Sequence, residues 1–167
     1  MCPRARWRVS SLSTKHKQLK ANTVRLLEFS QLIGLPLILT EQERLGSTVP
    51  AIKNVIPDVR PVSKAVFNCF LCDEFAGQVH QTGRSTLILT GVETHICVAQ
   101  TALHALPHFK VHVASDAVSS RTLHNWNVRL ERMRQRGAVI NSTEMIMLEL
   151  LRQAGTDEFR TALPLVK

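Results

Sequence analysis

The chain has 167 residues, of which 44% are hydrophobic and 20% are charged, a composition typical of a single globular domain. Its longest apolar run is far shorter than the ~20 residues that a membrane-spanning helix needs, so no membrane partner is expected. The net charge of +8 is concentrated at one end, because six of the 21 basic residues lie in the first 20 positions and leave 15 against 13 acidic residues elsewhere. This distribution does not predict a nucleic-acid partner.

Residues 1–20 are basic, rich in serine and free of acidic side chains. They lack the apolar core of a secretory signal, and organelle-targeting peptides and ordinary basic tails share their composition. We predict a poorly ordered arm over residues 1–20 and one folded domain over residues 21–167. Four cysteines do not make a disulfide framework in a chain of this length, which indicates a reducing compartment and predicts a cytoplasmic protein.

Helical and strand-like patterns alternate along the domain. Helical spacing of apolar residues and end signals predict helices over residues 22–34, 125–136 and 143–151, the last capped by Ser142 or Thr143. Short apolar runs predict strands over residues 35–40, 62–67, 87–91, 110–116 and 138–140. The alternation predicts an α/β fold, a three-layer Rossmann-like sandwich with a mostly parallel sheet and helices on both faces. Ligands bind at the carboxyl ends of the strands in such sheets.

Cys97 follows a predicted strand after a turn that begins at Gly91, and it lies at the start of a helical segment. The free N–H groups and the dipole of a helix start favour an anion, so this position predicts an accessible thiolate and suits a nucleophile. The alternative is a buried cysteine that packs as a small hydrophobic residue. For Cys69 and Cys72, a C-x-x-C pair, we expect core packing or a pocket wall; redox chemistry and half of a zinc site are the alternatives.

Several short motifs resemble those of one family, the isochorismatase-like cysteine hydrolases, in the branch of the isochorismatase domain-containing proteins. The nucleophile loop of that family is similar to Gly91-Val92-Glu93-Thr94-His95-Ile96-Cys97. Further similar segments lie in the family's order over residues 39–42, 64–68, 114–121, 131–138 and 142–145. The resemblance covers about residues 21–167.

The resemblance implies a catalytic pair made of Cys97 as nucleophile and Lys64 as the cation beside it. It also implies an oxyanion hole made by the backbone amides of Glu93 and Cys97, next to a cis Val92–Glu93 peptide bond. An ammonium group within a few Å favours thiolate over thiol, so the physical chemistry agrees with these roles. The expected partner is a small molecule of the amide, urea or vinyl-ether type, and homo-oligomers are common in the family. No cofactor and no metal are expected.

Four other residues are predicted to line the pocket: Phe67, Asn68, His95 and Glu41. Phe67 is equally suited to the core, and His95 to packing within the loop. For Asp116, at the end of a predicted strand, we expect a cap on the turn that follows.

The family's first strand, central in its sheet, ends in a catalytic Asp, and this chain has no Asp before Asp58. We therefore expect the central strand to be missing or degenerate. Three explanations are open: an incomplete N-terminus, which we favour, a pseudoenzyme, or a carboxylate supplied from elsewhere, for which Glu41 is the candidate. The predicted function is a cysteine hydrolase whose activity is impaired by the missing Asp. The alternative function is that of a catalytically inactive or truncated domain that acts through oligomer or partner binding.

Overall fold

The structure is a computed structural model and describes residues 12–166. Helix α1 spans Leu12–Leu32, so it begins ten residues earlier than the apolar periodicity predicts. Residues such as Lys and Gln have good helix propensity, and they extend this helix along its exposed side. The second half of the predicted basic arm is therefore helical, and its first eleven residues lie outside the described part of the chain.

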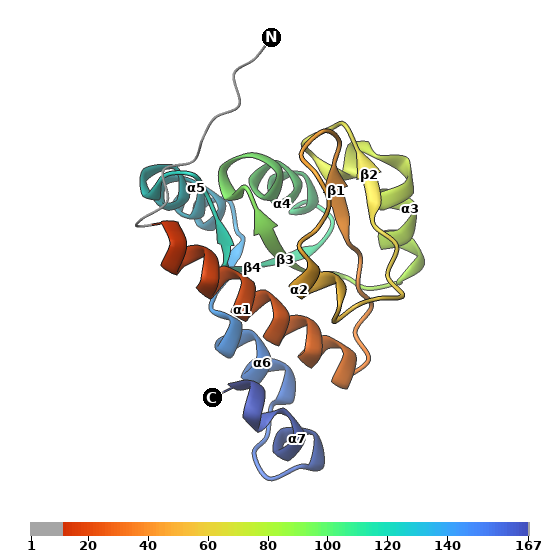
Figure 1. Ribbon diagram of the computed structural model, residues 1–167, viewed down its shortest axis with the longest axis vertical. Helices are drawn as coiled ribbons and strands as arrows, with labels where there is room; N and C mark the ends of the chain where they lie inside the picture. The colour runs from red at the N-terminus through yellow and green to blue at the C-terminus, as the bar shows by residue number, and fades with distance from the viewer. Residues whose placement is uncertain (1–11, 167) are drawn as a thin grey trace.

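The strands pair in parallel, as predicted, but in two sheets and not in one (Figure 1). The strands are β1 (Thr40–Gln42), β2 (Val62–Lys64), β3 (Thr86–Val92), β4 (Lys110–Ser119) and β5 (Val139–Asn141). One sheet contains β1 and β2, and the other has the order β3-β4-β5. The predicted strand over residues 35–40 forms ladder bonds only near its end, where the Val62 N–H donates to the carbonyl of Leu39. Pro36 within it has no N–H to give.

Helices cover both faces of the larger sheet, which confirms the predicted α/β architecture (Figure 1). The α-helices that follow α1 are α2 (Pro50–Lys53), α3 (Asp73–Gln81), α4 (Ala99–Ala105), α5 (Leu123–Gln135), α6 (Thr143–Leu151) and α7 (Asp157–Val166), and of these α4 to α7 pack on the larger sheet. Val111 and Val113 of β4 pack in one core cluster with α4 and α5, and Ala114 packs in another with α1, α6 and α7. Ser142 caps α6, as predicted, by accepting a hydrogen bond from the Met145 N–H.

The two sheets share one hydrophobic cluster although no ladder joins β1 to β3 among the described residues. Ile38, just before β1, and Leu87 of β3 both pack against this cluster. The middle of β3 is only partly buried, whereas Val111 and Val113 of the neighbouring β4 are fully buried. The break between the sheets agrees with the predicted loss of a central strand.

Candidate active site

The loop that carries Cys97 joins β3 to α4. Gly91 has φ +107, which favours glycine, and the Val92–Glu93 peptide bond is cis, as the resemblance implied. A single π-helical turn, Thr94–Val98, follows and leads directly into α4. The Glu93 carbonyl accepts hydrogen bonds from the N–H groups of Ile96, at 3.1 Å, and Val98, at 3.3 Å. Cys97 thus sits on the first helical turn after the strand, where it is neither fully buried nor exposed.

Lys64 ends β2 and is almost completely buried, with 4% of its surface exposed. Its Nζ donates hydrogen bonds to Gln42 Oε1, at 2.7 Å, and to the Val66 carbonyl, at 3.0 Å. None of the ion pairs found among residues 12–166 involves Lys64. The ammonium group is therefore held by neutral oxygens.

Gln42 connects the ammonium group to the thiol. Its Oε1 lies 3.9 Å from Cys97 Sγ as a hydrogen-bond acceptor, and its Nε2 donates to the Ala65 carbonyl at 2.6 Å. Gln42 lies opposite Lys64 in the parallel β1–β2 register, so both side chains leave the sheet near its carboxyl end. The structure thus brings Lys64 and Cys97 together through a residue that the sequence analysis did not single out. The available signal was its position at the end of a strand, one residue after Glu41.

Glu41 does not join this group, which makes it a wrong choice for the replacement carboxylate. Neighbouring residues of a strand point to opposite faces, and the Glu41 side chain turns toward the loop after β1. There its Oε1 accepts a hydrogen bond from the Thr48 N–H at 2.7 Å and lies 3.3 Å from Lys53 Nζ. The Thr48 hydrogen bonds and Lys53 lower the pKa of the Glu41 carboxyl. Its role is to fix this loop.

The groups around Cys97 shift the pKa of its thiol in opposite directions. Burial raises the pKa of Cys97, and the charges of Cys69 and Glu93 act in the same direction. The Lys64 charge and a hydrogen bond from the Glu93 backbone lower it, but burial prevails. In the free protein the net direction is opposite to the thiolate that the helix start predicted. Lys64 and the Glu93 backbone thus favour the thiolate, and burial favours the thiol.

A second polar group lies on the outer side of the same loop. Arg121 Nε donates to the two oxygens of the Glu93 carboxylate, at 3.2 and 3.1 Å. His95 Nδ1 lies 3.3 Å from one of these oxygens. His95 Nδ1 is also 3.1 Å from Ser120 Oγ. His95 therefore makes the contacts of a residue that packs within the loop.

The predicted pocket residues after Lys64 have different surroundings. Phe67 is 51% exposed, so it is not a core residue. Asn68 is buried, and its side chain caps the short 3-10 turn Cys69–Leu71 by accepting from the Phe70 N–H at 3.1 Å. Cys69 packs in the cluster shared by the two sheets, and its N–H donates to Thr101 Oγ1 at 3.0 Å. Core packing of this cysteine is confirmed.

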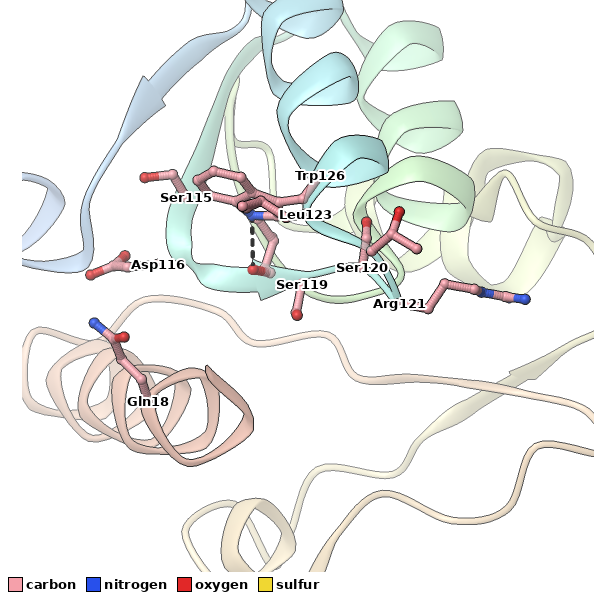
Figure 2. A pocket seen from close by; sticks show the side chains of 10 residues that line it. Gln18, Ser115, Asp116, Ser119, Ser120, Arg121, Leu123 and Trp126 are labelled. Carbon is pink, nitrogen blue, oxygen red and sulfur yellow. Dashed lines mark hydrogen bonds between the residues drawn. The ribbon is translucent and has the colours of Figure 1, made fainter. Parts of the chain in front are cut away.

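A cavity between α1, β4 and α5 is separate from the thiol. It has a volume of about 600 Å³ and is lined from α1, the end of β4 and the start of α5 by Gln18, Ser115, Asp116, Val118, Ser119, Ser120, Arg121, Thr122, Leu123 and Trp126. In Figure 2 Gln18 faces Asp116 from α1, and Arg121 extends away from the other side chains. Neither Lys64 nor Cys97 lines it.

Asp116, within this cavity wall, does not cap its own turn, which corrects the prediction. Its Oδ1 accepts hydrogen bonds from the N–H and hydroxyl of Thr143, at 2.8 and 2.9 Å, and its Oδ2 accepts from Asn22 Nδ2 at 3.0 Å. It therefore connects the start of α6 and the middle of α1, contacts that no local sequence pattern predicts.

The described part of the chain holds neither a cluster of metal ligands nor a helix suited to a membrane. No group of three His, Cys, Asp or Glu side chains within residues 12–166 has the arrangement that could hold a metal ion. No helix in the same part of the chain is both long and apolar enough to cross a membrane.

Comparison with known proteins places these features in context. The model of the isochorismatase domain matches residues 7–145. The secreted isochorismatase effector Isc1 of Phytophthora sojae is 40% identical over 152 residues, which are 87% of this chain and 72% of that protein.

Two solved structures are similar in fold and sequence. The ycaC gene product of Escherichia coli, described as an octameric hydrolase of unknown specificity, superimposes with a TM-score of 0.83 at 29% identity, over 89% of this chain and 76% of that chain. YcaC of Pseudomonas aeruginosa, solved with hexane-2,5-diol and covalent acrylamide, has a TM-score of 0.81 at 28% identity, over 89% and 77% of the two chains.

Proposed function

Because the chain belongs to the isochorismatase domain family, we propose that it is a hydrolase in which Cys97 is the nucleophile. The observation that carries this proposal is the shared oxygen of Gln42, which accepts from Lys64 Nζ at 2.7 Å and lies 3.9 Å from Cys97 Sγ. A cation next to a partly accessible thiol is one of the arrangements that favour the thiolate needed for covalent catalysis by cysteine. We expect the substrate to be a small amide, urea or vinyl ether.

For an amide, the thiolate of Cys97 forms a bond to the carbonyl carbon, and the π electrons move to the oxygen. The N–H groups of Glu93 and Cys97 are the donors proposed for this oxyanion. Collapse of the intermediate breaks the C–N bond, the amine leaves with a proton from solvent, and a thioester remains. Water then attacks the thioester, which releases the acid and restores the thiol.

Within residues 12–166, no carboxylate forms a hydrogen bond with Cys97 Sγ as a general base would. Gln42 occupies the position between the ammonium group and the sulfur, and an amide cannot accept the thiol proton as a carboxylate can. Loss of a positioned general base costs ~10²–10⁴ in rate, so we expect slow turnover. Since burial raises the pKa of Cys97, we also expect the rate to increase with pH above neutrality.

Turnover of a panel of small amides, ureas and vinyl ethers tests the proposal, with mass spectrometry of the acylated peptide. Cys97→Ser should abolish turnover and the adduct, and Lys64→Met should reduce both. Cys72→Ser is the matched control, because this cysteine is also only partly buried and packs against the hydrophobic cluster shared by the two sheets. Hydrolysis that persists in Cys97→Ser would overturn the assignment of the nucleophile.

The alternative function, an inactive domain that acts by assembly or partner binding, is supported by a different observation. The sheet is interrupted between β1 and β3, and the middle of β3 is only partly buried. Unpaired strand edges favour association. A relative is described as octameric, which supports a homo-oligomer here as well. A defined oligomer by light scattering, together with no turnover on the panel, would favour this function over hydrolysis.

A further inference from the structure

Glu93 contacts three parts of the site at once. Its carbonyl accepts from the N–H groups of Ile96 and Val98 and so begins the helical turn that carries Cys97. Its backbone lowers the pKa of the Cys97 thiol, whereas its carboxylate charge raises it. Its carboxylate is turned outward, where both oxygens meet Arg121 Nε, at 3.2 and 3.1 Å. Glu93 therefore brings a negative charge into the loop that carries the sulfur, and Arg121 is the cation that meets this charge.

Arg121 is anchored to the neighbouring strand. Arg121 lies two residues after Ser119, which is the last residue of β4. Ser119 lies opposite Val92 in the β3–β4 register. The cis bond between Val92 and Glu93 comes next, so the ends of the two strands lie side by side where the loop begins. Ser120, which is buried, adds its hydroxyl contact to His95 at 3.1 Å. The end of β4 thus contacts the loop through two consecutive residues.

We propose that Arg121 is a positioning residue for Cys97: its guanidinium holds the Glu93 carboxylate at the end of β4 and offsets its negative charge in the loop that carries the sulfur. The catalytic significance of this inference rests on the proposed function. The effect of Arg121 and Glu93 on the thiol does not, because their charges act on Cys97 whether or not a substrate is turned over.

The charges around the thiol give the expected signs. Lys64 at the end of β2, Cys69 in the 3-10 turn and Glu93 in the loop are the charged or titratable groups that act on Cys97. The Glu93 carboxylate raises the pKa of Cys97, and Arg121 and His95 are its partners. Without Arg121 the negative charge is less compensated, and the thiolate becomes harder to form. Without the carboxylate, the thiolate becomes easier to form.

These opposite signs separate positioning from a merely structural role. Arg121→Gln and Glu93→Gln break the same ion pair, so a purely structural contribution changes both variants in the same direction. An electrostatic contribution to the thiol changes them in opposite directions. Exposed ion pairs contribute little to stability, and the Arg121 side chain is 50% exposed, so both variants should fold.

The experiment is the pH dependence of alkylation of Cys97 by iodoacetamide, followed by mass spectrometry of the peptide that contains this cysteine. We expect Arg121→Gln to move the midpoint to higher pH by about half a unit and Glu93→Gln to move it to lower pH by a similar amount. Arg121→Lys, which keeps the charge, should restore part of the difference. Arg134→Gln is the matched control, because Arg134 forms a similarly exposed pair with Glu131, and its midpoint should equal that of the unmodified protein.

The inference is overturned if the midpoint of Arg121→Gln equals that of the unmodified protein, or if both glutamine variants move it in the same direction. Melting temperatures of the variants identify a loss of folding separately. Failure of the proposed function gives a different result: turnover is then absent or independent of Cys97, whereas the alkylation midpoints of the variants are still separated.

Discussion

The two long edges of β3 have different neighbours. On one side β4 pairs with it in parallel from Thr86 to Val92, with one shift of register between Leu89 and Gly91. On the other side no strand pairs with it among the described residues, although Ile38 and Leu87 pack against one cluster across the break. We call these the paired side and the open side. Lys64 and Gln42 belong to the open side, and the contact of Arg121 with Glu93 belongs to the paired side.

This difference shows that the site is assembled from a well-packed part and a less packed part. The paired side holds the loop of Cys97 by a ladder, an ion pair and buried valines. The open side supplies the ammonium group from a two-stranded sheet whose strands are three residues long. Two-stranded sheets have little stability of their own, so the position of Lys64 depends on the cluster beneath it.

The comparison is tested most strongly by truncating one isoleucine on each side. Ile146 on α6 is 2% exposed and lies in the core cluster of the paired side, whereas Ile38 near β1 is only partly buried. We expect Ile146→Ala to lower the free energy of unfolding by ~2–5 kcal/mol, and Ile38→Ala to lower it by less than half as much. Urea denaturation measures both. Equal losses would mean that the open side is packed as tightly as the paired side.

Asp116 is expected to have the next largest effect. Its carboxylate accepts from Thr143 at the start of α6 and from Asn22 on α1, so it joins two helices to the end of β4. Asp116→Ala leaves these donors without a partner and should lower the free energy of unfolding by ~1–3 kcal/mol, measured by urea denaturation. Asp157→Ala is the control, because Asp157 is an exposed partner of Arg160. A loss no larger than that of the control would contradict this role.

Lys64→Met should have opposite effects on stability and on reactivity. The Lys64 ammonium is buried with neutral acceptors only, and a buried charge without a counter-ion is costly, so an apolar side chain of similar size should raise the free energy of unfolding by ~1 kcal/mol. Alkylation of Cys97 should fall roughly tenfold at neutral pH, because Lys64 favours the thiolate. Lys53→Met, at an exposed lysine, is the control. Faster alkylation in Lys64→Met would refute the electrostatic role.

Local signals in the sequence predicted the elements that depend on local physics. The cap at Ser142, the helix of α5 and the turn at Gly91 follow from neighbouring residues alone. Lys64 and Cys97, which were predicted from motifs in the family's order, lie around the same Gln42 oxygen, and their catalytic roles stay a prediction. The early start of α1 was missed because polar residues continue a helix without apolar periodicity.

The remaining features depend on contacts between distant segments. Gln42 meets Cys97 across 55 positions, and Glu93 meets Arg121 across 28. The choice between Glu41 and Gln42 depends on which face of a three-residue strand turns toward the thiol, and the alternation of a strand does not specify this without its partners. The net pKa of Cys97 likewise depends on burial, which the helix-start signal does not contain.

A buried histidine on the paired side gives the smallest expected effect, a dependence of stability on pH. His112 of β4 is buried, and Asn141 Nδ2 donates to its Nδ1 at 3.2 Å. Burial, and then the Lys110 charge, lower the pKa of His112 below 6.5, although Glu149 opposes them. Between the folded and unfolded pKa values the unfolded chain binds more protons, so stability decreases as pH falls below about 6.5.

The variant that isolates this effect is His112→Gln, whose side chain oxygen can still accept from Asn141 but does not titrate. Urea denaturation at pH 7.5 and pH 5.5 measures the loss of unfolding free energy on acidification in both proteins. We expect this loss to be larger in the unmodified protein than in the variant, by less than about 1 kcal/mol. Because His112 lies on the paired side, its titration should leave the alkylation of Cys97 unchanged. If the stability of His112→Gln depends on pH as strongly as that of the unmodified protein, the loss of stability at low pH comes from groups other than His112.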